Sequence, residues 1–231
     1  MNELDWLAGA DPLAMLDYLG EQVTERKLRL FACACVRRFW ADLRWPIPRE
    51  AVAMAERFAE GTATIEEVET MRAQADGSAA NAPELDQFAY NAAAATLEEA
   101  AQDAARGARE AIRQHAVRMA AYETIYGENE IQVSADASDY ESRRQVELLN
   151  ELFGNPFRPV VIQPHWLAWE DGIVVSMARE IEEAQRFAEL PYLADALMDA
   201  GCDEESLLRH LRQREGHIRG CWALDRLLGN G

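Results

Sequence analysis

One stretch constrains the fold of this chain more than any other. Residues 84–124 are rich in alanine, contain no proline and have Gly107 as their only glycine. Alanine has the highest helix propensity of the amino acids, whereas glycine and proline interrupt helices. The stretch therefore predicts one long helix, or two helices joined near Gly107. Runs such as Ala92–Ala95 let helices approach closely but specify little packing, which favours a spacer or an outer helix.

The rest of the chain shows the same helical pattern. Asp11 followed by Pro12 is typical of a capped helix start, and Thr64 with Glu67 has the spacing of a capping box. Apolar periodicity predicts further helices at 24–45, 48–60, 139–153, 171–188, 191–200, 203–212 and 221–228. We expect loops at 76–82 and 127–139, the latter with a short extended piece at 131–133 as an alternative, and a proline-rich connector at 154–166. The prediction is an all-α fold, a single-domain multi-helix orthogonal bundle with an Ala-rich long-helix insert.

The charge balance excludes several classes of partner. The chain has 41 acidic and 23 basic side chains, a formal net charge of -18. Nucleic-acid backbones and anionic lipid surfaces attract clusters of lysine and arginine, so we expect neither nucleic-acid backbone binding nor membrane binding. No run approaches the ~18 apolar residues of a membrane span, and the N-terminus lacks the pattern of a signal peptide. These features predict a cytoplasmic protein, in which Cys33 and Cys35 are buried free thiols.

The strongest candidate for a chemical site is a group of cysteines and histidines near the C-terminus: Cys202, His210, His217 and Cys221. Such residues are typical zinc ligands. However, the spacing of Cys202 and His210 puts them roughly 12 Å apart on one helix, too far to share a tetrahedral ion. At most three of the four can meet. The sequence alone therefore assigns no metal and no cofactor, and it leaves His210, His217 and Cys221 as weak candidates for metal ligands.

A second group consists of candidate ligand-binding residues: His165, Trp166, Arg209, Arg212 and Arg219. A histidine in a loop can act as a base or a ligand, and arginines can hold an anion bidentately. The alternatives are a packed His165 that bonds backbone, and arginines paired with nearby glutamates. No catalytic residue is assigned, because the sequence has no nucleophile elbow, phosphate-binding loop, dinucleotide fingerprint or zinc-protease motif.

Five segments resemble an uncharacterised family of proteins typical of planctomycete-type bacterial genomes. The segments are ERKLRLFACACVRRFW, VAMAERFAEG, LFGNPFRPV, LPYLADALMDAGC and HIRGCWALDRLLG. The resemblance covers residues 1–61 and 143–229 and implies no activity, cofactor or residue role. It implies that both ends of the chain fold together as one domain over 1–231, with residues 62–142 as a variable helical insert.

Three functions are compatible with these features. The first is a non-enzymatic protein-interaction or accessory module that binds another protein through Phe157, Trp166 and Trp169, since aromatic residues often anchor partners. The second is a small-molecule or metal-dependent enzyme with a pocket near His165 and the arginines of 209–219. The third is an acidic DNA mimic, which requires carboxylates spaced along one ridge. The absence of catalytic motifs favours the first function and a protein that is not an enzyme.

Overall fold

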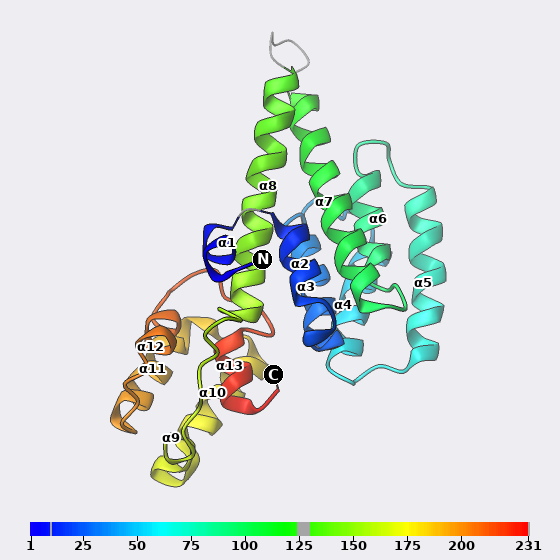
Figure 1. Ribbon diagram of the computed structural model, residues 1–231. Coiled ribbons are helices and arrows are strands. Elements are labelled where there is room, and N and C mark those ends of the chain that lie inside the picture. The colour runs from blue at the N-terminus through cyan, green and yellow to red at the C-terminus, as the bar shows by residue number, and fades with distance from the viewer. Residues whose placement is uncertain (10, 124–129, 231) are drawn as a thin grey trace. The chain divides into compact units, whose positions relative to one another are not determined.

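The computed structural model describes residues 1–9, 11–123 and 130–230, and this part of the chain is helical and contains no strand (Figure 1). The α-helices are α1 Glu3–Ala8, α2 Pro12–Leu19, α3 Glu25–Arg37, α4 Pro46–Ala59, α5 Ile65–Ala80, α6 Gln87–Ala95, α7 Ala101–Glu123, α8 Glu130–Phe153, α9 Pro164–Ala168, α10 Ile173–Ala184, α11 Leu190–Asp199, α12 Glu205–Leu211 and α13 Trp222–Leu228. The predicted all-α multi-helix fold is confirmed. None of the described helices is both long and apolar enough to cross a bilayer.

The contacts divide the chain into two compact units. Unit 1 consists of Met1 and Ala8–Leu148, and unit 2 consists of Asn2–Leu7 and Leu149–Gly231. The boundary therefore falls inside α8, because the last turn of this helix packs with the C-terminal helices. One domain with an insert over 62–142 stays a prediction.

Unit 1 is built around α3, whose residues from Lys27 to Val36 are all buried. This helix packs against α7 and α4, and α6 also lies against α7. Cys33 and Cys35 are 1% and 0% exposed, which confirms that both thiols belong to the core. The helix ends at Arg37, earlier than the predicted end near Pro46, since the following residues form turns.

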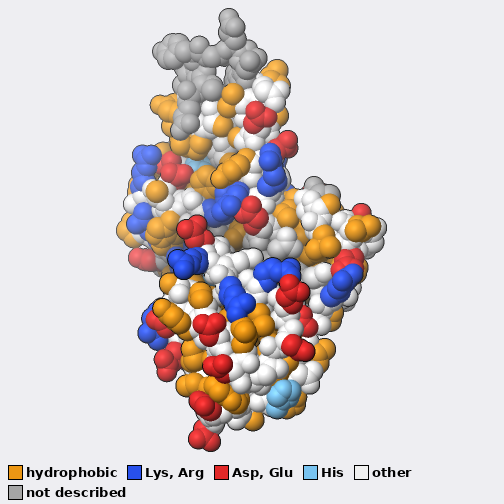
Figure 2. Space-filling view, turned by 90° about the vertical axis from the view of Figure 1, so that its left-hand side faces the viewer, with side chains coloured by type: hydrophobic (Ala, Val, Ile, Leu, Met, Phe, Trp, Pro, Cys, Tyr) orange, Lys and Arg blue, Asp and Glu red, His pale blue; other side chains and the backbone are white. Residues whose placement is uncertain are grey.

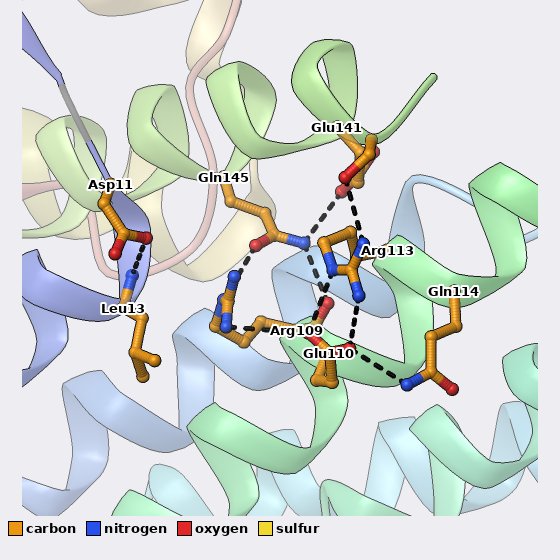
Figure 3. Close-up of polar contacts among 9 residues, drawn as sticks. Asp11, Leu13, Arg109, Glu110, Arg113, Gln114, Glu141 and Gln145 are labelled. Carbon is orange, nitrogen blue, oxygen red and sulfur yellow. Dashed lines mark hydrogen bonds and ion pairs between the residues drawn. The ribbon is translucent and has the colours of Figure 1, made fainter. Parts of the chain in front are cut away.

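A buried polar network joins α7 and α8 within unit 1 (Figure 3). The Arg109 Nε–H donates to the Gln145 side-chain oxygen (3.0 Å), and the Gln145 amide donates to the Arg109 carbonyl (2.9 Å) and to Glu141 (3.2 Å). Arg38 from the end of α3 forms an ion pair with Glu141 at 2.8 Å, although burial raises the pKa of this carboxyl. Buried polar groups that satisfy one another in this way fix how two helices align.

Several predicted boundaries in unit 1 are wrong. The Ala-rich stretch breaks at residues 96–100 rather than at Gly107, which lies inside α7 where an added Cβ would be 3.3 Å from Ala95. The glycine is there for close helix packing. The loop expected at 76–82 is helical as far as Ala80, and residues 131–133 belong to α8 instead of an extended piece. Residues 124–129, where part of the irregular segment was expected, lie outside the described residues.

Unit 2 packs around the apolar faces of α10, α11, α12 and α13. Leu193, Leu197 and Leu211 are fully buried there. The proline-rich connector contributes Trp166, which is 4% exposed, and Trp169 packs against the same core. Cys202 follows Gly201 (φ 85°) at the predicted junction between α11 and α12, and its N–H donates to the Leu197 carbonyl at 2.9 Å. The order of α10 to α13 was therefore predicted correctly, whereas α9, which begins at Pro164 inside the expected connector, was not predicted.

Acidic side chains are interspersed with basic and apolar ones on the face drawn in Figure 2. Many carboxylates in unit 1 are paired, as in the ion pairs of Arg26 with Glu60 (3.0 Å) and Arg106 with Asp17 (2.7 Å). The DNA-mimic function requires a ridge of carboxylates spaced like phosphates. The described residues on this face form no such ridge.

Candidate metal centre

Four side chains of unit 2 converge on one point: Glu151, His210, His217 and Cys221. One ligand atom from each lies within 4.8 Å of all the others. The His210 Nε2 is 3.1 Å from the Cys221 Sγ and 3.5 Å from a Glu151 oxygen. The His217 Nδ1 is 3.0 Å from the other Glu151 oxygen. A carboxylate, two imidazoles and a thiol thus share one largely buried space.

The C-terminal helices and the turn between them position these groups. His210 lies in the last turn of α12, and Cys221 is the N-cap residue of α13. The chain between them turns at Gly216 and Gly220, whose φ angles of 91° and 81° fall in the left-handed region that favours glycine. The Gly220 N–H donates to the buried Glu182 carboxylate of α10 at 3.0 Å. This bond holds the residue next to Cys221 in place.

His217 is oriented by both of its ring nitrogens. Its Nε2–H donates to the Gln213 carbonyl at 3.0 Å, because a carbonyl can only accept. The Nδ1 then faces Glu151. Histidine ligands of metals commonly donate their second ring N–H to a backbone carbonyl, which fixes the tautomer and the ring direction. His217 has this arrangement.

The electrostatics of the cluster suit an ion that replaces protons. Burial lowers the pKa of His210 to about 4, so its imidazole is neutral at pH 7. Burial acts to lower the pKa of His217 too, but the hydrogen bond and charge of Glu151 outweigh it and the net shift is upward. Burial and the Glu151 charge raise the pKa of the Cys221 thiol. A cation among these groups would displace the protons that the thiol and His217 otherwise hold.

The distances are close to those of a tetrahedral zinc site. Ligand atoms about 2.0–2.3 Å from a tetrahedral Zn²⁺ are about 3.3–3.6 Å apart. The His210–Cys221 separation of 3.1 Å and the Glu151–histidine separations of 3.0 and 3.5 Å are near this range; the latter two involve different Glu151 oxygens, and the four ligand atoms together lie within 4.8 Å. Small rotations of the side chains would therefore open the space for an ion. The donor set of nitrogen, sulfur and oxygen is also one that zinc accepts.

The structure unites three of the four residues that the sequence singled out. His210, His217 and Cys221 meet, whereas Cys202 lies in the apolar core of unit 2 and outside this cluster. Three of the four residues therefore meet, as many as were expected to. The fourth member, Glu151, could not be predicted from the sequence, because it precedes His217 by 66 positions and stands in an ordinary acidic helix pattern. Its only signal is its place next to Leu152, which is fully buried.

Of the candidate ligand-binding residues, Arg209 and Arg212 line one described cavity of about 300 Å³, which His165, Trp166 and Arg219 do not line. His165 is exposed at the start of α9, and Trp166 beside it is buried in the core. Arg209 pairs with Glu205 and also lines a second cavity, which His165 does not line. The two other candidates have separate partners: Arg212 lies 3.8 Å from Asp195, and Arg219 lies 3.0 Å from the Gln185 side-chain amide. Neither described cavity joins His165 to the arginines, and His165 is exposed on α9.

The aromatic residues proposed as partner anchors pack within their own unit. Trp166 is 4% exposed, and Trp169 is partly buried against the same core. Phe157 is half-buried. Trp166 in α9 and Trp169 just after it pack against the core of unit 2, to which α10 contributes, and the expected role of these aromatic residues in partner binding stays a prediction.

Comparison with known protein families, with curated proteins and with solved structures found no match.

A tight contact beside the cluster gives a testable expectation. Gly154 has a φ of 63°, and a Cβ added there would be 3.1 Å from the Trp222 ring, which packs 4.9 Å from the His210 ring. We expect Gly154→Ala to lower the free energy of unfolding by roughly 2–3 kcal/mol, from backbone strain together with displacement of the indole. Urea unfolding followed by circular dichroism measures this change.

Gly201→Ala is the matched control. Gly201 has a φ of 85°, but no atom lies within 4 Å of its added Cβ. It should therefore lose only the roughly 1 kcal/mol that a left-handed conformation costs a non-glycine residue. Equal losses in the two variants would contradict the role of the Trp222 contact.

Proposed function

We propose that this chain is a zinc-binding protein whose single Zn²⁺ is held by Glu151, His210, His217 and Cys221. The observation that carries the proposal is the convergence of these four side chains, with all ligand atoms within 4.8 Å of one another. Clusters of this composition in a buried space would be costly without either shared protons or a cation, because each polar group has left water. Zinc supplies the compensating charge.

The ligand set favours zinc over the other common biological metals. Calcium and magnesium prefer oxygen ligands, and this set has only one carboxylate. Thiolate and imidazole ligands suit zinc, which accepts a tetrahedral arrangement without a redox change. With one thiolate and one carboxylate, a Zn²⁺ centre is formally neutral. That neutrality matches an environment in which Glu151 is 7% and Cys221 is 0% exposed.

The proposed role of the ion is structural. Sites with four protein ligands are closed, whereas catalytic zinc keeps a position open for water or substrate. Here the ligands come from α8, α12, the turn after it and the start of α13. The ion would therefore tie the C-terminal turn to α8. In this proposal the C-terminal helical unit is stabilised by a structural metal ion.

Metal analysis of the purified chain tests the proposal. We expect elemental analysis of protein prepared with zinc to give about one Zn²⁺ per chain, as a single four-ligand site requires. Exchange for Co²⁺ should produce the visible absorption of tetrahedral Co²⁺ with a thiolate charge-transfer band. His217→Ala should lose both signals, because it removes a ligand and the hydrogen bond that orients it.

His165→Ala is the matched control, since His165 is an exposed histidine of the same unit and does not belong to the cluster. It should keep full metal content and the unchanged Co²⁺ spectrum. Protein that contains no zinc after preparation in excess zinc, or an octahedral Co²⁺ spectrum without the thiolate band, would overturn the proposal.

A further inference from the structure

A cavity of about 720 Å³ lies within unit 2, beside the candidate metal centre. Its size is in the range of pockets that bind small molecules. Phe153 and Trp222 contribute aromatic surface to its lining, the fully buried Trp6 lies behind it, and His210 belongs both to this lining and to the cluster. The walls thus combine apolar surface with charged groups, as in sites for organic ligands.

The carboxylates that line the cavity already have partners. Glu3 accepts hydrogen bonds from the Asn155 amide (2.9 Å) and pairs with Arg158 (2.7 Å). Glu205 pairs with Arg209 at 2.7 Å. These pairs occupy two of the three guanidinium groups in the lining.

The third carboxylate, Glu204, serves the helix that follows it. It caps α12, where it accepts from the Ser206 hydroxyl (2.7 Å) and backbone N–H (3.4 Å). Its charge is thereby placed at a helix N-terminus, where a negative charge is favourable. Each of the three carboxylates therefore already accepts a hydrogen bond or pairs with a cation.

Arg226 is the remaining guanidinium of the lining. It is exposed and forms no ion pair or hydrogen bond with any described residue. It follows Trp222 by four positions on α13, so both side chains lie on the same face of the helix. This face of α13 presents the Trp222 indole and, one turn further along, the planar Arg226 guanidinium with its five N–H donors.

We infer that this cavity binds a small organic anion. The aromatic body of the ligand lies against Trp222, and its carboxylate or phosphate accepts paired hydrogen bonds from Arg226. Arginine recognises both acidic groups bidentately, and indole surface favours a flat apolar body. Binding of this anion would depend on the cavity and on α13, and not on the proposed zinc ion.

Calorimetric titration tests the inference with four probes. The anions are indole-3-acetate and AMP, which distinguish a carboxylate from a phosphate, and the uncharged counterparts are indole-3-acetamide and adenosine. We expect at least one anion to bind with a Kd below about 1 mM and its uncharged counterpart to bind at least about tenfold more weakly, as expected for hydrogen bonds to a charged group. Arg226→Gln should abolish that preference.

Arg179→Gln is the matched control, because Arg179 is an exposed arginine of unit 2 that has no partner among the described residues and does not line the cavity. It should bind the anion like the unchanged protein. Absence of binding by both anions, or equal binding by the unchanged protein and Arg226→Gln, would overturn the inference. Zinc content is measured on the same samples to separate the two proposals. If the protein binds no zinc but still binds the anion through Arg226, the zinc proposal fails and the anion-binding proposal is supported.

Discussion

Replacing Cys221 with serine is expected to remove the bound zinc and much of the stability that it confers. Among these four side chains, the Cys221 thiolate is the most typical zinc ligand. Serine is a poor substitute because its hydroxyl stays protonated at neutral pH. In protein prepared with zinc, we expect the metal content to fall from about one ion per chain to below about 0.1. The free energy of unfolding should fall by at least roughly 4 kcal/mol, because metal binding and folding are coupled.

Two comparisons separate the loss of zinc from a loss of packing. Cys202→Ser makes the same chemical change at a buried cysteine of unit 2 outside the cluster, and it should keep one zinc per chain. In metal-free protein, Cys221→Ser should change the unfolding free energy by less than about 1.5 kcal/mol, since it only replaces a small side chain near His210. Thermal and urea unfolding with and without a chelator measure both effects. Full zinc content in Cys221→Ser, or its loss in Cys202→Ser, would contradict the assignment.

The candidate site was only partly predictable from the sequence. Cys202 lies outside the cluster, as expected, but it precedes α12 and does not share a helix with His210 as the spacing argument assumed. Spacing along the chain could not show that a turn through Gly216 and Gly220 would bring His217 and Cys221 back to His210. It also could not provide Glu151, because a distant acidic residue becomes a candidate ligand only once tertiary packing has buried it.

The fold shows the same division between local and tertiary information. Local signals were sufficient for the Asp11 cap, the Thr64 capping box and the order of α10 to α13. They failed at residues 96–100, where alanine-rich helices break without a glycine or proline. The chain can turn there because another helix satisfies the backbone carbonyls that the break exposes. The group that does so is Arg29 of α3, within a sequence segment that otherwise predicts an apolar core helix.

Arg29 holds the break between α6 and α7 together. It is 2% exposed, and its guanidinium donates to the carbonyls of Thr96 (2.8 Å), Glu98 (2.8 Å) and Glu99 (3.1 Å). The carbonyls at the end of a helix have no partner within it, so they need donors from elsewhere. The Phe58 ring lies 5.0 Å below the guanidinium, and burial lowers the pKa of Arg29. This arrangement predicts a large cost for its removal.

Arg29→Met is therefore expected to lower the free energy of unfolding by about 3–5 kcal/mol, because it fills similar space but leaves the three carbonyls without their donor. Arg29→Lys should lose less, roughly 1–2 kcal/mol, since an ammonium group keeps the charge but cannot reach the carbonyls as a planar fork. Arg106→Met is the matched control: its ion pair with Asp17 is about half exposed, and pairs of this kind contribute at most about 1 kcal/mol. Urea unfolding at pH 7 distinguishes these expectations, and an Arg29→Met loss no larger than that of Arg106→Met would show that the break is held by apolar packing alone.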